Sequence, residues 1–279
     1  MNDFKDQRKG FTLIELLIVV GIIAVLASAV FVSVKGAREK AAIARGLHFS
    51  AQVDHALAVD IIAKWPFDEG EGNTVNDVSG GKRNGTIQGT LLWKDDNPAG
   101  KEGHSLEFDG NTSNYIEVSN LSSSLLQSGG TISVWVRFDG EGITDAGILD
   151  KYSGKYSTNG FYYDIDVNNK KVSFEINKGA GVFSENNSIS IDNTKWQNLV
   201  VTYNSGGQVT HYINGVQSGA QGTTNAPDQI TIDEPLKIGE DFKGLMTDVR
   251  IYGSPLSASQ IQERYYAELE DLMARGIIE

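Results

Sequence analysis

The sequence predicts an α+β protein in which a long N-terminal helix is followed by an all-β sandwich and a short C-terminal helix. Three observations predict this order. Residues 11–34 form an almost purely apolar run, the chain from Trp65 onward has short β-branched and aromatic runs between Gly, Asn, Ser and Thr, and Ser257 precedes an amphipathic stretch. The 279 residues suit one sizeable domain with an appendage.

The first element is the apolar run of residues 11–34, which is long enough to cross a membrane as a helix. Glu15 is the only charged residue within it. A carboxylate at membrane depth costs about 2.5–3.5 kcal/mol, so we expect Glu15 to have a cationic partner. No Lys or Arg lies in the run to act as that partner. The run is also longer than the apolar region of a secretory signal peptide.

The segment from Gly10 to Glu15, which reads Gly-Phe-Thr-Leu-Ile-Glu, resembles the processing motif of type IV pilins and type II secretion pseudopilins. The resemblance implies that residues 1–10 are a leader, and that prepilin peptidase cuts after Gly10 and methylates the new amino terminus of Phe11. That amine then supplies the missing cation, because it can pair with Glu15 of a neighbouring subunit in a filament. The alternative is a plain membrane anchor that carries a stray glutamate.

The same resemblance implies a location and a set of partners. The precursor is expected as a single-pass protein of the inner (cytoplasmic) membrane, and the processed chain in an extracellular pilus or an envelope pseudopilus. The expected partners are prepilin peptidase, copies of this chain and other pilins. The net charge of -12 argues against nucleic acid as a partner.

The helical pattern continues beyond the apolar run in amphipathic form. Apolar residues recur at spacings of three and four as far as Ile61 and Ile62. Pro66 then ends the pattern, because the residue before a proline is disfavoured in a helix. We therefore predict one long helix from Phe11 to about Ile62, within a pilin-helix segment of residues 11–64.

Residues 65–266 are predicted to form the β domain. Strands are predicted for the β-branched and aromatic runs at residues 105–108, 115–118, 131–138, 160–166, 171–176, 197–203, 209–213, 236–239 and 245–252. Asn214-Gly215 follows one of these runs and is a strong hairpin signal, since both residues tolerate positive φ. Many short strands without intervening helices predict a two-sheet sandwich.

Seven pieces of this domain, in their order and spacing, resemble a laminin G-like, concanavalin A-like jelly roll. They lie at residues 65–70, 76–80, 106–110, 131–136, 196–203, 212–215 and 248–252. The family usually has an acidic residue where Thr247 stands. The resemblance implies a domain that binds an extracellular carbohydrate or glycoprotein.

Calcium, in a structural role, is the cofactor that the jelly-roll resemblance allows. It binds Asp and backbone carbonyl oxygens in Gly-rich loops. Asp77, Asp109 and Asp248 belong to motif pieces that the resemblance brings near one another, so we name them as candidate calcium ligands. The alternative is that these carboxylates cap turns through Asx hydrogen bonds.

The sequence gives no reason to assign catalytic residues. Glycoside hydrolysis needs two suitably placed carboxylates, and the closely spaced Glu-x-Asp-x-x-Glu strand of hydrolases with this fold is missing. Asp164 and Asp166 alternate along one predicted strand, which indicates a solvated surface or a polar ligand groove. Four tryptophans are expected in the core more than in a sugar site, namely Trp65, Trp93, Trp135 and Trp196.

Ser257 and Gln260 form a capping-box pattern for a helix that runs through Ile261 and Tyr265 to Leu272. Residues 267–279 extend past the usual end of the family's domain, and we expect this helical tail to pack on the sandwich or to fray. The chain has no cysteine, so disulfide bonds do not stabilise it.

These features together favour a type IV pilin-like filament subunit that displays its laminin G-like domain for surface adhesion or for carbohydrate or glycoprotein binding. The alternative is a pseudopilin of a type II secretion system, in which the domain contacts cargo. A membrane-anchored glycan-processing enzyme is disfavoured because the catalytic cluster is missing. The ligand itself is not specified by the sequence.

Overall fold

The computed structural model describes residues 13–14, 16–23, 60–95, 103–139, 145–152, 159–176, 182–186 and 195–274. Residues 13–14 and 16–23 are helical, in agreement with the predicted N-terminal helix. The processing residues Gly10, Phe11 and Glu15 lie outside the described residues, as does most of the predicted helix. Among the described residues, no helix combines the length and the apolar character needed to cross a membrane. The chain divides into two compact units, Met1–Arg45 and Gly46–Glu279.

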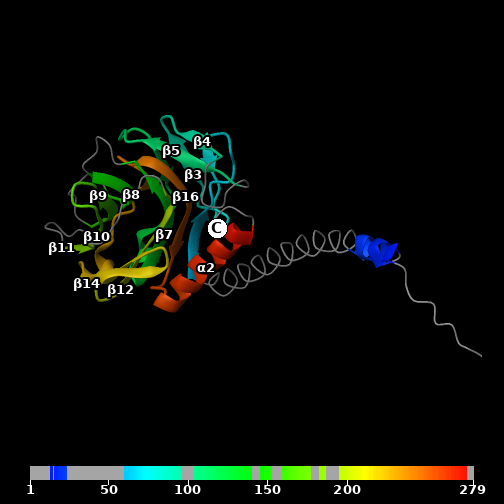
Figure 1. The fold of residues 1–279 in the computed structure, drawn as a ribbon. Helices are drawn as coiled ribbons and strands as arrows, with labels where there is room; N and C mark the ends of the chain where they lie inside the picture. The colour runs from blue at the N-terminus through cyan, green and yellow to red at the C-terminus, as the bar shows by residue number, and fades with distance from the viewer. Residues whose placement is uncertain are drawn as a thin grey trace, which may run out of the picture. The chain divides into compact units, whose positions relative to one another are not determined.

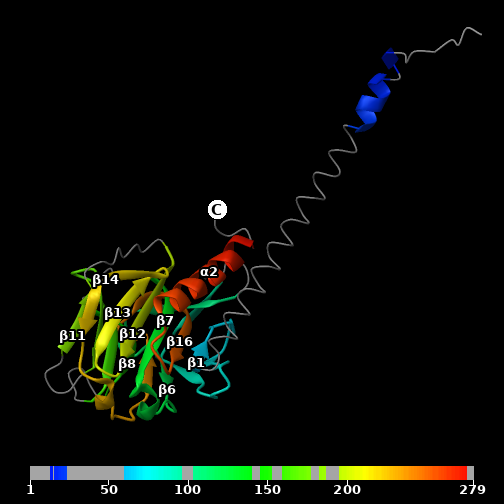
Figure 2. The ribbon, with the colours of Figure 1, turned by 90° about the horizontal axis from the view of Figure 1, so that it is seen from below.

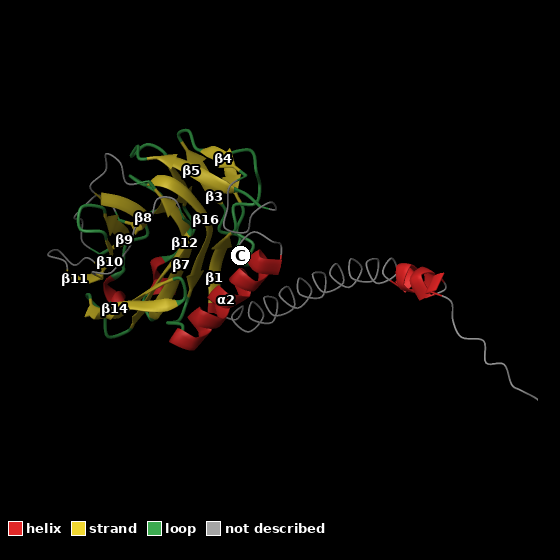
Figure 3. Cartoon of the chain, in the orientation of Figure 1, coloured by secondary structure: helices red, strands yellow, loops and turns green. Residues whose placement is uncertain are grey.

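The second unit is a sandwich of two antiparallel sheets (Figures 1 and 3). Sheet A has, in spatial order, β14 (Val216–Thr223), β13 (Gln208–Ile213), β12 (Gln197–Asn204), β7 (Gly129–Phe138), β16 (Lys243–Tyr252), β5 (Ser105–Asp109) and β4 (Leu92–Lys94). A further strand of sheet A, β1 (Ile61–Trp65), pairs with β16. Sheet B has β11 (Val182–Asn186), β10 (Lys171–Ile176), β9 (Phe161–Asp166), β8 (Asp145–Lys151), β15 (Leu236–Ile238), β6 (Tyr115–Val118), β3 (Gly85–Gln88) and β2 (Thr74–Val75). Two 3-10 turns, η2 (Ser123–Leu126) and η3 (Pro227–Gln229), complete the connections.

The hydrophobic core lies between the two sheets, because alternate residues of each strand point to opposite faces. In β9, Phe161, Tyr163 and Ile165 are buried in the core, whereas Asp164 and Asp166 are only partly buried. Aromatic rings fill much of the interior, and Phe174 and Tyr203 stack across it with centroids 4.9 Å apart. We call the face of each sheet that points away from this core its outer face.

All nine predicted strands are confirmed, with ends that shift by no more than two residues. The prediction of helix at Ile61 and Ile62 was wrong, because residues 61–65 form β1. This segment pairs with β16 from Ile61 opposite Tyr252 to Trp65 opposite Val249. Ile and Trp favour strands where a sheet edge is available, so the tertiary pairing overrides a helix-like spacing of apolar residues. The sandwich therefore begins at β1 and not at Trp65.

The start of β1 is held by hydrogen bonds from two other parts of the domain. The backbone oxygen of Asp60 accepts from the N–H of Gly253 at 2.8 Å, and its Oδ2 accepts from the Ser254 hydroxyl at 2.9 Å. The backbone oxygen of Ile62 accepts from Nη1 of Arg83 at 2.7 Å. We call these contacts the Asp60 clasp. They join the start of β1 to the residues that follow β16 and to the loop between β2 and β3.

The C-terminal helix α2 (Ala258–Ala274) packs on the outer face of sheet A (Figure 2). Its predicted capping box is confirmed, since Ser257 N–H donates to Oε1 of Gln260 at 2.9 Å and Gln260 N–H donates to Oγ of Ser257 at 3.3 Å. A second apolar cluster joins the helix to the sheet and contains Val200, Tyr212, Tyr252, Leu256, Ile261 and Ala267. The sandwich thus has a main core between its sheets and a smaller one under α2.

Candidate functional site

Asp77, one of the three candidate calcium ligands, holds the loop between β2 and β3 against β1. Its Oδ1 accepts from the backbone N–H groups of Lys64 at 3.0 Å and of Ser79 at 2.9 Å, and its Oδ2 accepts from Arg83 N–H at 2.9 Å. Burial opposes ionisation, but these hydrogen bonds together with that of the Ser79 side chain lower the pKa of Asp77 below its ordinary value. The carboxylate is therefore used as an Asx cap, as the alternative prediction had it.

Asp109 and Asp248, the other two candidate calcium ligands, each have partners that differ from those of Asp77. Asp109 accepts from Asn111 N–H at 3.0 Å and from Nδ2 of Asn114 at 2.9 Å, which is a second Asx turn. Asp248 forms an ion pair with Arg250. The structure does not bring Asp77, Asp109 and Asp248 together, and among the described residues no three His, Asp or Glu side chains are grouped so that they could hold a metal ion.

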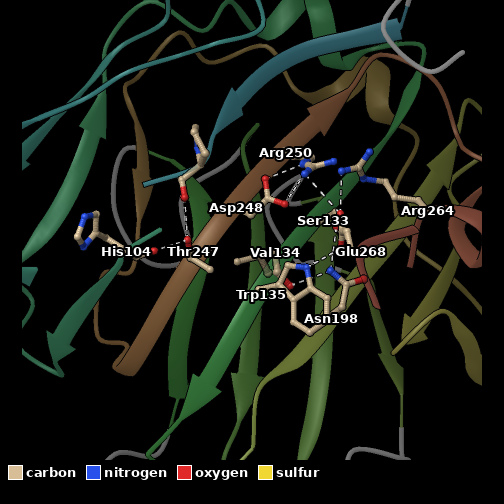
Figure 4. Close-up of polar contacts among 11 residues, drawn as sticks. His104, Ser133, Val134, Trp135, Asn198, Thr247, Asp248, Arg250, Arg264 and Glu268 are labelled. Atoms are coloured by element: carbon tan, nitrogen blue, oxygen red, sulfur yellow. Dashed lines mark hydrogen bonds and ion pairs between the residues drawn. The ribbon is translucent and has the colours of Figure 1, made fainter. Parts of the chain in front are cut away.

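Asp248 belongs to a buried charge network that fastens α2 to sheet A (Figure 4). Arg250 Nε donates to Oδ1 of Asp248 at 2.7 Å, and its Nη2 lies 3.4 Å from Oε1 of Glu268. Burial alone would lower the pKa of Arg250, but Asp248 and Glu268 raise it above its usual range. Glu268 also accepts from Arg264 Nη2 at 2.7 Å and from the Trp135 indole N–H at 2.7 Å. We call this set the α2 lock and assign it a structural role.

Thr247 stands where the jelly-roll resemblance leads us to expect an acid, and it also ties segments together (Figure 4). Its hydroxyl oxygen lies 2.7 Å from the backbone oxygen of Pro66 and 2.9 Å from that of His104. Thr247 is 4% exposed, so this contact connects β16 to the segments after β1 and before β5 inside the protein. The residue offers no charge for a ligand.

The tryptophans lie mainly in structural positions, as predicted. Trp65 is fully buried and its indole N–H donates to the Arg83 backbone oxygen at 2.7 Å. Trp135 is buried under α2, where its ring stacks on Tyr265 with centroids 5.9 Å apart. Trp93 packs against the main core, and Trp196 is partly buried.

The outer face of sheet B has the feature that most favours a ligand, a row of ionisable side chains across neighbouring strands. Lys237 of β15 lies opposite Asp150 of β8, Asp150 opposite Tyr162 of β9, and Tyr162 opposite Glu175 of β10. Asp164 lies on the same face one pair further along β9 and accepts a hydrogen bond from the Ser173 hydroxyl. We call Asp150, Asp164 and Glu175 the acid row.

Asp150 is the most unusual member of the acid row. It is 3% exposed, and its Oδ1 is buried without a hydrogen-bond partner in the described part of the chain. The carboxyl group leans over Gly147, where a Cβ atom would lie only 2.3 Å from Oδ2 of Asp150. Burial, together with Asp164, Glu240 and Asp241, raises the pKa of Asp150 well above its ordinary value, against the opposing effect of Lys237.

Glu175 shows the same effect in a milder form. It is 7% exposed, and burial together with Asp164 raises its pKa to about 7. Buried acids with raised pKa values are found disproportionately at functional sites, because a fold without such a role tends to neutralise them.

An ammonium group and three aromatic rings border the acid row. Lys237 Nζ donates to Oε1 of Glu240 at 2.6 Å and lies 4.8 Å from the ring centroid of Tyr115. Tyr152 donates its hydroxyl to Oε2 of Glu240 at 2.8 Å and stacks on Tyr162 with centroids 4.3 Å apart. Hydrogen bonding to carboxylates and a ring face is the chemistry by which proteins bind organic cations.

Sequence reasoning found only part of this face. The alternation of Asp164 and Asp166 is confirmed, but Asp166 closes the turn after β9 through Asn169, whose Nδ2 donates to it at 2.7 Å. Asp150 and Glu175 were missed, since an isolated acid between apolar residues gives no sign of its neighbours in the sheet. The one available signal was an acid within each of two strand-like runs, in Leu149-Asp150-Lys151 and Phe174-Glu175-Ile176.

The two-sheet antiparallel sandwich with a helix on one outer face has the architecture of a jelly roll. Residues 109–262 match the concanavalin A-like lectin/glucanases superfamily, and the chain belongs to that family. Residues 5–31 match the prokaryotic N-terminal methylation motif, as found in type IV pilin-like precursors. No curated protein matches the chain.

Solved structures with the same fold include domain 4 of AbnA, an extracellular arabinanase from Geobacillus stearothermophilus, in complex with arabinotriose. It is 22% identical, with a TM-score of 0.52 over 74% of this chain and 98% of that one. The binding domain of Paraclostridial Mosquitocidal Protein 1 (14% identity, TM-score 0.57) is matched over 75% of this chain and 52% of that one. The botulinum neurotoxin serotype D/C binding domain (15% identity, TM-score 0.58) is matched over 76% of this chain and 53% of that one. The chain thus spans about half the length of the two toxin domains, and these likenesses concern the fold alone.

Proposed function

We propose that this chain is a type IV pilin-like filament subunit that displays its jelly-roll domain for surface adhesion, by binding an extracellular carbohydrate or glycoprotein. The observation that carries the proposal is the presence in one chain of the methylation motif at residues 5–31 and the concanavalin A-like domain at residues 109–262. The first is a signal for assembly, and the second is a fold that binds ligands in other proteins.

Assembly starts with processing at the inner membrane. Prepilin peptidase cuts after Gly10 and methylates Phe11, and the resulting cationic amino terminus pairs with Glu15 of a neighbouring subunit. The apolar helices then bury their surface against one another, as copies of this chain and other pilins enter the filament. Each added subunit repeats the jelly-roll domain along the polymer.

A filament that carries many copies of a weak binding site can adhere strongly to a surface. Once one domain has bound a surface, the next domain meets its ligand at a high effective concentration. AbnA domain 4 binds arabinotriose, and the toxin domains are described as binding domains, which supports a binding role for this one. We propose that the domain acts by binding and not by catalysis, with loops at one edge of the jelly roll contacting the ligand.

The deciding experiment compares filaments of the intact chain with filaments of a chain that lacks residues 60–279, on glycan-coated and glycoprotein-coated surfaces. The intact filaments are expected to adhere far more strongly, and equal adhesion would refute the proposal. A pseudopilin that contacts secretion cargo is the alternative, because the methylation motif is common to both classes. Recovery of the chain in sheared surface filaments favours the pilus, whereas retention in the envelope favours the pseudopilus.

A further inference from the structure

The outer face of sheet B holds three carboxyl groups close together, and the described part of the chain places little positive charge beside them. The acid row places a carboxyl group on each of three adjacent strands, β8, β9 and β10. Among the described charged groups with the largest effect on Asp150, Lys237 is the one cation, and its ammonium group is paired with Glu240. Lys171 of β10 lies opposite Asp166 and not opposite the acid row.

We propose that the acid row binds a primary ammonium group, presented by an amino sugar of an extracellular polysaccharide. This inference rests on the proposed function, which it deepens by naming the class of glycan. It places the glycan on the outer face of sheet B, beside the stacked rings of Tyr152 and Tyr162.

The observation that indicates a ligand is Oδ1 of Asp150, which is buried without a hydrogen-bond partner among the described residues. A buried acceptor without a donor loses the hydrogen bonds it would make to water, so such groups are uncommon in folded proteins. Gly147 provides the space that this carboxyl occupies, because any larger residue would meet Oδ2 of Asp150 at the position of its Cβ atom. A cation that donates to Asp150 would satisfy the free oxygen and relieve the repulsion from Asp164.

An ammonium group fits this chemistry better than a metal ion or a neutral sugar. The described His, Asp and Glu residues do not gather in a set of three that could coordinate a metal ion. A neutral hydroxyl offers a single donor, whereas an ammonium group brings three donors and a positive charge that favours the ionised form of these carboxyl groups. The same face already binds one ammonium group in this way, that of Lys237, between Glu240 and the ring of Tyr115.

The two tyrosines favour an amino sugar over a flexible amine. Tyr152 is partly exposed and stacks on Tyr162, which is 9% exposed, so the pair forms a stiff aromatic edge next to the row. Aromatic rings at ligand sites pack on flat apolar surface, and a sugar ring offers such a surface on its C–H face. The ammonium group and the ring of one sugar unit would then use the carboxyls and the tyrosines at the same time.

The test titrates the full chain in detergent micelles with glucosamine oligomers, N-acetylglucosamine oligomers of equal length and lysine oligomers. Variants Asp150→Asn and Glu175→Gln neutralise the row. Glu263→Gln removes one charge from an exposed position on α2 and is the matched control. We expect the glucosamine oligomers to bind, the acetylated oligomers to bind about tenfold or more weakly, and either row variant to weaken binding about tenfold, since a charge-assisted contact is lost.

A second measurement separates a ligand site from a structural role. Because Oδ1 of Asp150 is buried with no hydrogen-bond partner among the described residues, D150N should melt at a higher temperature than the parent at pH 8 while it loses the ligand. A lower melting temperature would contradict the role of Asp150 as an unpartnered ligand group, and E175Q then tests the binding claim without it.

Three results would overturn the inference: equal binding of the glucosamine and acetylated oligomers, binding that survives both row variants, or equal binding of lysine oligomers, which would show that the sugar is not recognised. If no oligomer binds while filaments still adhere to neutral glycans, the inference fails and the proposed function stands. If filaments do not adhere to any glycan or glycoprotein either, both fail.

Discussion

Replacing Glu268 by Ala should loosen α2 from the sandwich, because this one carboxylate serves three buried donors. Arg264 Nη2 lies 2.7 Å and Arg250 Nη2 3.4 Å from its Oε1, and the Trp135 indole donates to Oε2 at 2.7 Å. Removing one partner of a buried ion pair costs about 3–5 kcal/mol. Arg250 keeps Asp248 as a partner, so we expect a loss of about 2–4 kcal/mol in the free energy of unfolding.

That loss corresponds to a fall in melting temperature of about 10 °C for a domain of this size. Thermal unfolding of the full chain in detergent, followed by tryptophan fluorescence, measures it, and Trp135 reports on the helix directly. Glu263→Ala is the control, since Glu263 lies on the exposed side of the same helix and should shift the midpoint by little. Melting of Glu268→Ala within about 2 °C of this control would refute the α2 lock, since the expected cost is several times larger.

Three further predictions concern the rest of the chain. The raised pKa of Glu175, about 7, means that the folded state binds its proton more tightly than the unfolded state, so stability should fall by about 1–3 kcal/mol as pH rises from 4.5 to 7 and stay low above it. Urea unfolding at pH 4.5 and pH 8 should therefore differ less in Glu175→Gln than in the parent, and an unchanged difference would assign the effect elsewhere. Mass spectrometry of the mature chain should find methylated Phe11 at the amino terminus, and Glu15→Ala should enter the membrane normally but incorporate poorly into filaments; an intact Met1 or normal incorporation would count against this assembly scheme. Because Asp77, Asp109 and Asp248 have separate partners, melting in calcium and in chelator should give equal curves, and a higher melting temperature in calcium would reveal an ion bound by the folded domain.

The strands that sequence reasoning found are those with a strong local pattern. The runs that form β7, β12 and β16 are rich in β-branched and aromatic residues. They are also short, and turn residues bound them at both ends, which favours strands over helices. The strands it missed include the short β2 and β4, of two and three residues, and also the longer β8 and β14, of seven and eight. In β8 and β14, Gly and polar residues interrupt the β-branched pattern that marks the other strands. The capping box of α2 and the Asx turns of Asp77 and Asp109 could also be predicted, because each depends on residues close in sequence.

The acid row could not be predicted, because it depends on sheet register. Its strands β8 and β10 are joined only through β9, and a bulge between Gly147 and Leu149 interrupts the alternation of β8. As a result Ile148 and Leu149 both lie in the core, and Asp150 reaches the outer face. Strict alternation along the sequence would have placed these residues differently. The same dependence on distant pairing explains the mistaken helix at Ile61, where the sequence alone could not reveal the free edge of β16.

If the chain is the filament subunit proposed above, the Asp60 clasp has a mechanical consequence. Any tension from the N-terminal side enters the sandwich at Asp60 and passes into β1, which is paired along its length with β16 in sheet A. A pull along the axis of β1 loads its ladder bonds together in shear, along with the bonds of Gly253, Ser254 and Arg83 to the same segment. Several hydrogen bonds must therefore break together before β1 is pulled out of sheet A. Under flow, we expect the bond between the domain and its ligand to break before the domain unfolds.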